Sequence, residues 1–136
     1  MRIKLDQEVL GFSSVFERMT HALVKDCFKD DEGIVFVVAP GELGKAIGKG
    51  GMMIRKVQEK FSKKVRVIEY NPDVCKFVSN VIYPVKVDEV VEDDGVVYIK
   101  DDDRAKKGKI IGRSGSGLAF VNKVVSRFFG KEVKVQ

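Results

Sequence analysis

The sequence has few of the residues that build metal centres: two cysteines, Cys27 and Cys75, one histidine, His21, and no tryptophan. The two cysteines do not have the Cys-x-x-Cys spacing of metal ligands, and a single histidine cannot complete a set of zinc ligands. We therefore expect neither a metal site nor a cofactor. We interpret both cysteines as small apolar core residues. No apolar run approaches the roughly 20 residues of a membrane span, and residues 1–10 lack the apolar core of a signal peptide. We therefore expect a cytoplasmic protein without a membrane partner.

Catalytic motifs are also lacking. GKAIGKGG (44–51) does not have the spacing of a Walker loop, and no G-x-G-x-x-G occurs. His21 has no obvious nucleophile near it and is interpreted as a surface or boundary residue. The acidic run 101–103 could ligate Mg²⁺, but a solvated turn or a helix cap is the simpler interpretation. We expect a protein that is not an enzyme and has no small-molecule substrate.

The charged residues of the 136-residue chain, whose formal net charge is +5, are unevenly distributed. Segment 44–66 contains eight lysines and arginines and one acidic residue, and segment 104–134 contains nine and one. The acidic residues gather instead within 29–32, 92–94 and 101–103. A single basic run is equally well explained as a solvated surface. Two runs from which acidic residues are excluded indicate a polyanionic partner, with nucleic acid as the first choice.

An internal repeat divides the chain. GKAIGKGG (44–51) aligns with GKIIGRSG (108–115), 64 residues further on, and GIVFVV (33–38) parallels GVVYIK (95–100). We predict two domains, 1–70 and 71–136.

Both copies show the same order of predicted elements. The first has a helix over 14–23 capped by Ser13 or Ser14, a hairpin of strands 24–28 and 34–38, helices 41–47 and 52–61, and an edge strand 64–70. The second has a helix capped by Asp73, strands 83–91 and 95–100, helices 104–111 and 117–129, and a strand 132–135. Each copy therefore reads α-β-β-α-α-β, an α+β fold with a three-stranded sheet packed on helices.

A Gly-x-x-Gly turn joins two helices in each copy. Glycines allow a sharp turn and close approach of another backbone, and the helix that follows presents free N–H groups and its positive dipole end. Lys49 and Arg113 add a positive charge inside each turn, so a sugar-phosphate backbone would suit the site. The flanking Ile47, Ile54, Ile111 and Leu118 are interpreted mainly as core, with part of their surface supporting unstacked bases. Gly117 implies either a close backbone approach or a helix that starts late.

IGKGGMMI (47–54) and IGRSGSGL (111–118) resemble the I-G-x-x-G-x-x-[IL] signature of the KH domain, and the element order is that of type II KH domains. The resemblance implies binding of single-stranded RNA or DNA, with about four nucleotides clamped by each loop. It also implies which residues contact or border RNA. They are Gly44, Lys45, Ile47, Gly48, Lys49, Gly50, Gly51, Ile54, Arg55 and Arg66 in the first copy, and Gly108, Lys109, Ile111, Gly112, Arg113, Ser114, Gly115 and Leu118 in the second.

The resemblance extends to the archaeal NusA-type transcription factors. It rests on FERMTHALVKDC (16–27), FVVAPGELGKAIGKGG (36–51), VRVIEYNPDVCKFVSNVIYPVKV (65–87) and IIGRSG (110–115). The family implies RNA binding in transcription elongation, pausing or termination. The sequence shows no polymerase-binding domain, so contact with RNA polymerase stays open. Two alternatives also stay open: a KH protein of ribosome assembly or RNA decay, and a protein-interaction module without salt-dependent RNA affinity.

Overall fold

The computed structural model describes the backbone of residues 2–136 and the side chains of residues 11–136. The chain forms two compact units, Met1–Tyr70 (the first unit) and Asn71–Gln136 (the second unit). Among the residues described, no helix combines the length and apolar character needed to cross a membrane.

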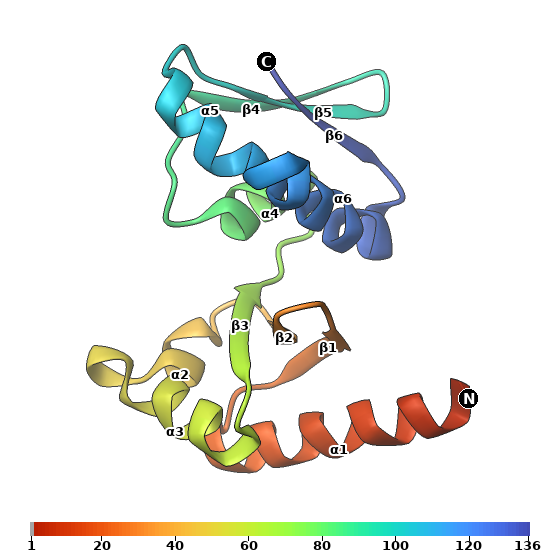
Figure 1. Cartoon of the computed structure of the whole chain (residues 1–136), viewed down its shortest axis with the longest axis vertical. Helices are drawn as coiled ribbons and strands as arrows, with labels where there is room; N and C mark the ends of the chain where they lie inside the picture. Colours follow the sequence, from red (N-terminus) through yellow and green to blue (C-terminus); the bar gives the residue numbers. More distant parts are fainter. Residues whose placement is uncertain (1) are drawn as a thin grey trace. The chain divides into compact units, whose positions relative to one another are not determined.

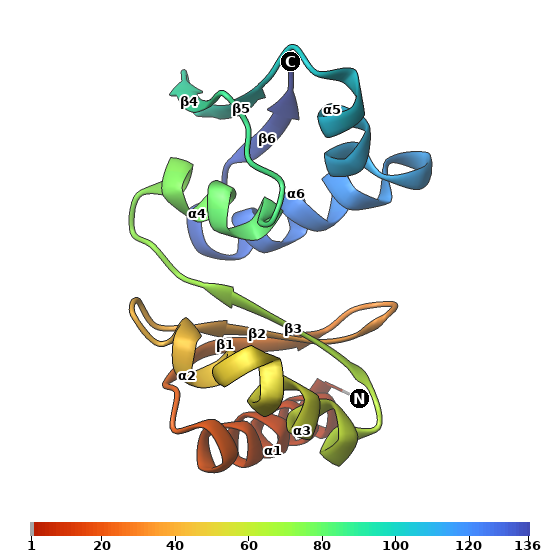
Figure 2. The same ribbon diagram turned by 90° about the vertical axis from the view of Figure 1, so that its left-hand side faces the viewer.

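The first unit is a three-stranded sheet with helices on one face (Figures 1 and 2). Its elements are α1 (Arg2–Thr20), β1 (Val24–Lys29), β2 (Gly33–Val38), α2 (Leu43–Ile47), α3 (Met52–Phe61) and β3 (Lys64–Glu69). The sheet order is β1-β2-β3, with β1 antiparallel and β3 parallel to β2. The predicted hairpin and the predicted edge strand are both confirmed.

The core of the first unit lies between the sheet and its helices. Phe16 of α1 stacks on Phe36 of β2, with ring centroids 4.0 Å apart, and Val57 of α3 joins them fully buried. Burying one such side chain stabilises the fold by roughly 1.5–3 kcal/mol. In β2 every residue of the run 34–38 is buried.

The first helix differs from the prediction at both ends. It begins at Arg2, so Ser13 and Ser14 lie inside it and cap nothing. It ends at Thr20, whose hydroxyl donates to the carbonyl of Phe16 at 2.8 Å and accepts the N–H of Ala22 at 3.0 Å. These side-chain bonds replace the next helical turn. His21 follows in the left-handed region, with φ 61°, and is exposed as expected.

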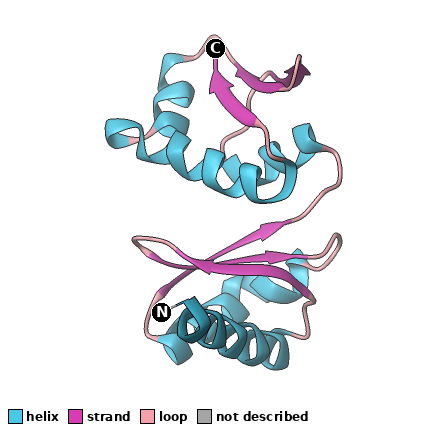
Figure 3. Cartoon of the chain, turned by 90° about the vertical axis from the view of Figure 1, so that its right-hand side faces the viewer, coloured by secondary structure: helices cyan, strands magenta, loops and turns pink. Residues whose placement is uncertain are grey.

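The second unit repeats the same order (Figure 3). Its elements are α4 (Val74–Ile82), β4 (Glu89–Asp93), β5 (Val96–Lys100), α5 (Arg104–Ile111), α6 (Ser116–Phe129) and β6 (Glu132–Val135), with the sheet order β4-β5-β6. The predicted α-β-β-α-α-β order is therefore confirmed in both units. Asp73 caps α4 by accepting the N–H groups of Cys75 and Lys76, as predicted. Cys75 itself is only half-buried, so its assignment to the core is wrong, whereas Cys27 is buried.

The predicted strand 83–91 is also wrong in its first half, because β4 begins only at Glu89. Pro84 has no N–H to donate to a ladder. The N–H of Asp88 is bonded instead to the carboxylate of Asp101 at 3.0 Å.

Asp101 is a buried carboxylate that joins β5, α5 and the segment before β4. It also accepts the N–H of Asp103 at 2.7 Å and pairs with the ammonium of Lys106 at 3.5 Å. The Asp103 hydrogen bond is the main cause that holds the pKa of Asp101 below its ordinary value; the Asp88 bond and Lys106 act in the same direction, and burial opposes them. Of the acidic run 101–103, Asp103 forms the predicted helix cap, on α5.

Candidate nucleic-acid interface

The two Gly-x-x-Gly turns, Gly48–Gly51 (the first loop) and Gly112–Gly115 (the second loop), have the same backbone. Gly48 has φ 75° and ψ 171°, and Gly112 has φ 73° and ψ 178°. The last glycines also agree, at φ 78° and ψ 13° in the first loop and φ 79° and ψ 9° in the second. Each loop projects between its two helices, as Figure 1 shows for α2 and α3 and Figure 2 for α5 and α6.

The first glycine of each loop is required by the protein itself. A Cβ on Gly48 would lie 2.7 Å from Cβ of Met53, and one on Gly112 would lie 2.8 Å from the backbone nitrogen of Gly117. Both residues also have positive φ, which L side chains rarely adopt. These glycines are explained by the tight turn, without any ligand.

A second set of glycines has no such explanation. Gly44 lies in α2 and Gly108, its counterpart, in α5, and a Cβ at either position would meet nothing within 4 Å. Neither has a positive φ. Because glycine in a helix costs roughly 0.5–1 kcal/mol relative to alanine, the fold would be more stable without them. Exposed glycines that the packing does not need leave room for a backbone approaching from outside.

Positive side chains surround these open glycines. Lys49 and Arg113 are exposed inside the loops, and Lys109 is exposed in the last turn of α5. Lys45 on α2 pairs with Glu42 at 3.1 Å. The helices α3 and α6 begin directly after the loops, so their first N–H groups add the positive end of each helix dipole. Each loop region therefore combines positive side chains with free N–H groups, which together favour the binding of an anion.

Comparisons with known proteins agree with this geometry. A sequence profile described as KH domain matches residues 13–98. A protein of Methanococcus vannielii named probable transcription termination protein NusA is 40% identical over 99% of this chain and 80% of its own length. The chain belongs to the KH family and to its archaeal NusA-type branch.

Other NusA-type relatives extend the similarity. The probable transcription termination protein NusA of Methanocaldococcus jannaschii is 34% identical over 93% of this chain and 70% of its own length. The protein of that name from Halococcus morrhuae is 35% identical, over 95% and 94%. The crystal structure of APE1850 matches with a TM-score of 0.78 and 34% identity, covering 96% of this chain and 99% of that one.

The apolar residues that flank the KH loops are each half-buried. Ile54 packs against the core of the first unit, while Ile47, Ile111 and Leu118 likewise keep part of their surface exposed. Both interpretations of these residues, as core and as a partly open apolar surface, fit their burial.

Sequence reasoning missed two residues near the first loop, one directly after it and one at the start of α2. Met52 follows the loop directly and is 53% exposed. Two adjacent methionines at 52–53, of which only one can face the core, could have indicated an exposed apolar residue here. Glu42 accepts the N–H of Leu23 at 2.9 Å and thereby fixes α2 against the start of β1. That hydrogen bond, followed by Lys45, lowers the pKa of Glu42. Nothing in the local sequence indicates this partner, which lies 19 residues away.

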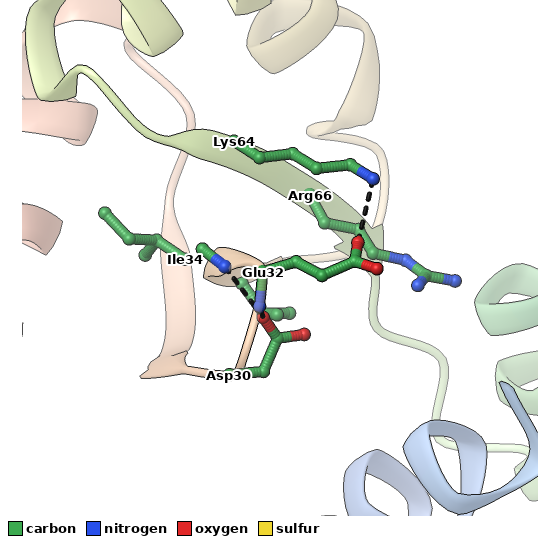
Figure 4. Close-up of a pocket in the computed structure, with 7 residues that line it drawn as sticks. Asp30, Glu32, Ile34, Lys64 and Arg66 are labelled. Atoms are coloured by element: carbon green, nitrogen blue, oxygen red, sulfur yellow. Dashed lines mark hydrogen bonds and ion pairs between the residues drawn. The ribbon is translucent and has the colours of Figure 1, made fainter. Parts of the chain in front are cut away.

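The structure does not bring Arg66 to the KH loop. Val65 and Val67 face the helices, so the residue between them points to the opposite face of the sheet. There it lines a small pocket with Asp30, Glu32 and Lys64 (Figure 4). Burial lowers the pKa of the Arg66 guanidinium, and the two carboxylates act in the opposite direction. The expectation that Arg66 borders the loop groove is therefore wrong, because a strand alternates its side chains. Arg55, by contrast, is exposed on α3.

The sequence left two explanations for Gly117, a close backbone approach or a helix that starts late, and the structure supports the first. The helix α6 begins at Ser116, before Gly117 rather than after it. A Cβ on Gly117 would lie 2.3 Å from the carbonyl oxygen of Ile110 and 3.1 Å from that of Ile111. The close approach is thus between α5 and α6 within the protein.

Proposed function

We propose that this protein is a NusA-type RNA-binding factor in which both units are KH domains, each clamping the backbone of single-stranded RNA with its loop. It acts by binding rather than by catalysis, in transcription elongation, pausing or termination. The names of the relatives support the transcription role. The family match supports the KH assignment.

The observation that carries the RNA clamp is the pair of open glycines, Gly44 and Gly108. Each weakens its own helix, fills no packing need and lies one turn before a loop that carries a positive charge. A phosphate held at the loop would place the adjoining sugar against this bare helix surface. An incoming backbone thus gives a physical reason for glycine at both places.

The clamp is tested by reversing the charge of the loops. The variants Lys49→Asp/Gly50→Asp and Arg113→Asp/Ser114→Asp should each weaken binding of a single-stranded oligoribonucleotide, and their combination should abolish it. Fluorescence anisotropy measures the affinity, and circular dichroism checks the fold. The wild-type affinity should also fall with salt, with a slope in log K of roughly −0.7 per phosphate contacted.

A matched control is available at the other end of α3, the helix that follows the first loop. Lys60→Asp/Ser62→Asp makes the same change of charge as Lys49→Asp/Gly50→Asp, at the far end of α3. Ser62 is exposed and has φ 53°, so it also matches the backbone of Gly50. If the control weakens RNA binding as much as the loop variant does, the basic surface acts as a whole and the loop clamp is refuted.

The transcription role needs a separate experiment. Crosslinking in cells should recover the protein on nascent RNA together with RNA polymerase subunits. Stable co-sedimentation with ribosomes, without nascent transcripts, would support a role in ribosome assembly instead.

A further inference from the structure

The two loops share a backbone but not their side chains. Gly50 has φ 61° and ψ 20°, and Ser114 at the same place has φ 56° and ψ 26°. Lys49 corresponds to Arg113, and the two residues that follow each loop are Met52 and Met53 in the first unit and Ser116 and Gly117 in the second. Because the two loop backbones coincide, a difference in what the loops bind must come from side chains in or beside them.

Ser114 stands where the fold favours glycine. A non-glycine residue with positive φ is disfavoured, and the first loop uses glycine there. Ser114 is exposed, and within the described part of the chain its hydroxyl has no hydrogen-bond partner. No hydrogen bond among the described residues therefore accounts for the serine, and its hydroxyl is open to a ligand.

Ser116 adds a second hydroxyl beside the first. It is the first residue of α6, it is exposed, and its side chain is likewise without a hydrogen-bond partner among the residues described. Its counterpart Met52 offers no strong donor or acceptor and exposes an apolar surface instead.

We infer that the second loop distinguishes RNA from DNA and that the first loop does not. The Arg113 guanidinium can hold a phosphate through two parallel hydrogen bonds. The hydroxyls of Ser114 and Ser116 then meet the ribose beside that phosphate. A serine hydroxyl and a 2′-hydroxyl are each donor and acceptor, so they pair in either direction, and deoxyribose lacks this partner.

The first loop lacks that discrimination. Lys49 is a point charge that attracts any phosphate, Gly50 has no side chain, and Met52 packs on a sugar or base through apolar contact. These interactions are the same for RNA and DNA. Both loops thus hold a phosphate, and only the second also contacts the 2′-hydroxyl of the ribose. This inference rests on the proposed RNA clamp.

The test compares one oligouridylate with the oligodeoxyuridylate of the same length, which differ only in the 2′-hydroxyl. The variant Ser114→Gly/Ser116→Met gives the second unit the first unit's residues at these two positions and keeps Arg113. Its ratio of RNA to DNA affinity should fall about fivefold, the size of one or two ordinary hydrogen bonds. The matched variant Gly50→Ser/Met52→Ser should raise the ratio. Ser114→Gly/Ser116→Ala, which adds no bulk, serves if the methionine disturbs α6.

The outcomes separate this inference from the proposed function. A ratio unchanged in either second-loop variant, while the wild type binds RNA and the loop-reversal variants do not, overturns the inference alone. A wild type that binds neither oligonucleotide in a salt-dependent manner overturns the RNA clamp as well.

Discussion

Replacement of Gly117 by alanine should destabilise the second unit, although alanine is the better helix former. The new Cβ would come within 2.3 Å of the carbonyl oxygen of Ile110, so the backbone of α5 or α6 must move. Overpacking of this kind costs about 1–3 kcal/mol, whereas the gain in helix propensity is about 1 kcal/mol at most. Because the contact is with backbone, we take the upper part of that range and expect a net loss of about 2 kcal/mol.

Gly108→Ala is the matched control, since it makes the same change in the neighbouring helix. Its Cβ meets nothing within 4 Å, so the substitution should stabilise the unit by about 0.5–1 kcal/mol. Urea unfolding of the full chain, followed by circular dichroism, compares the two. Amide hydrogen exchange in α6 assigns the change to the second unit. The reasoning is refuted if Gly117→Ala is as stable as Gly108→Ala.

Three further predictions concern stability. Ser114→Gly should raise the free energy of unfolding by about 1 kcal/mol and Gly50→Ser should lower it similarly; thermal melts that move in the same direction would contradict this. Gly33→Ala should destabilise the first unit by at least about 2 kcal/mol, because its Cβ would lie 2.0 Å from the carbonyl oxygen of Lys64; unchanged hydrogen exchange in β2 would contradict it. Asp101→Asn should lower the urea midpoint at pH 7. The lowered pKa of Asp101 in the folded protein means that its carboxylate stabilises the fold above the ordinary pKa of about 3.9. The urea midpoints of wild type and variant should therefore become equal as the pH falls through the pKa of folded Asp101; a difference in midpoint that is constant with pH would contradict this.

The order of elements could be predicted from the sequence because it depends on local signals. The hairpin of β1 and β2, the cap at Asp73 and the two glycine turns each rest on neighbouring residues. The predicted ends of elements are wrong where a hydrogen bond from a side chain, or from a residue far away in the sequence, determines where the element begins or ends. Thr20 ends α1 through its own hydroxyl, and Asp101 holds the segment before β4 away from a ladder.

The candidate site was predictable as a motif but not as a surface. The spacing of the glycines located both loops, but it could not show which glycines the fold itself requires. That distinction between Gly48 and Gly44 depends on the position of Met53 across the turn. Similarly, the side of the sheet on which Arg66 lies depends on the register of β3.

The burial of every residue in the run 34–38 of β2 has a consequence for the newly synthesised chain, in which this run is still exposed. Its run 34–38, IVFVV, is apolar, β-branched or aromatic throughout and uncharged, which is the composition of segments that form intermolecular β-sheets. Three acidic residues at 30–32 and Pro40 stand on either side of it, where charges and proline oppose such pairing. Variants that unfold the first unit should therefore be lost to aggregation during synthesis. Replacing Pro40 or the exposed Asp31 should increase that aggregation.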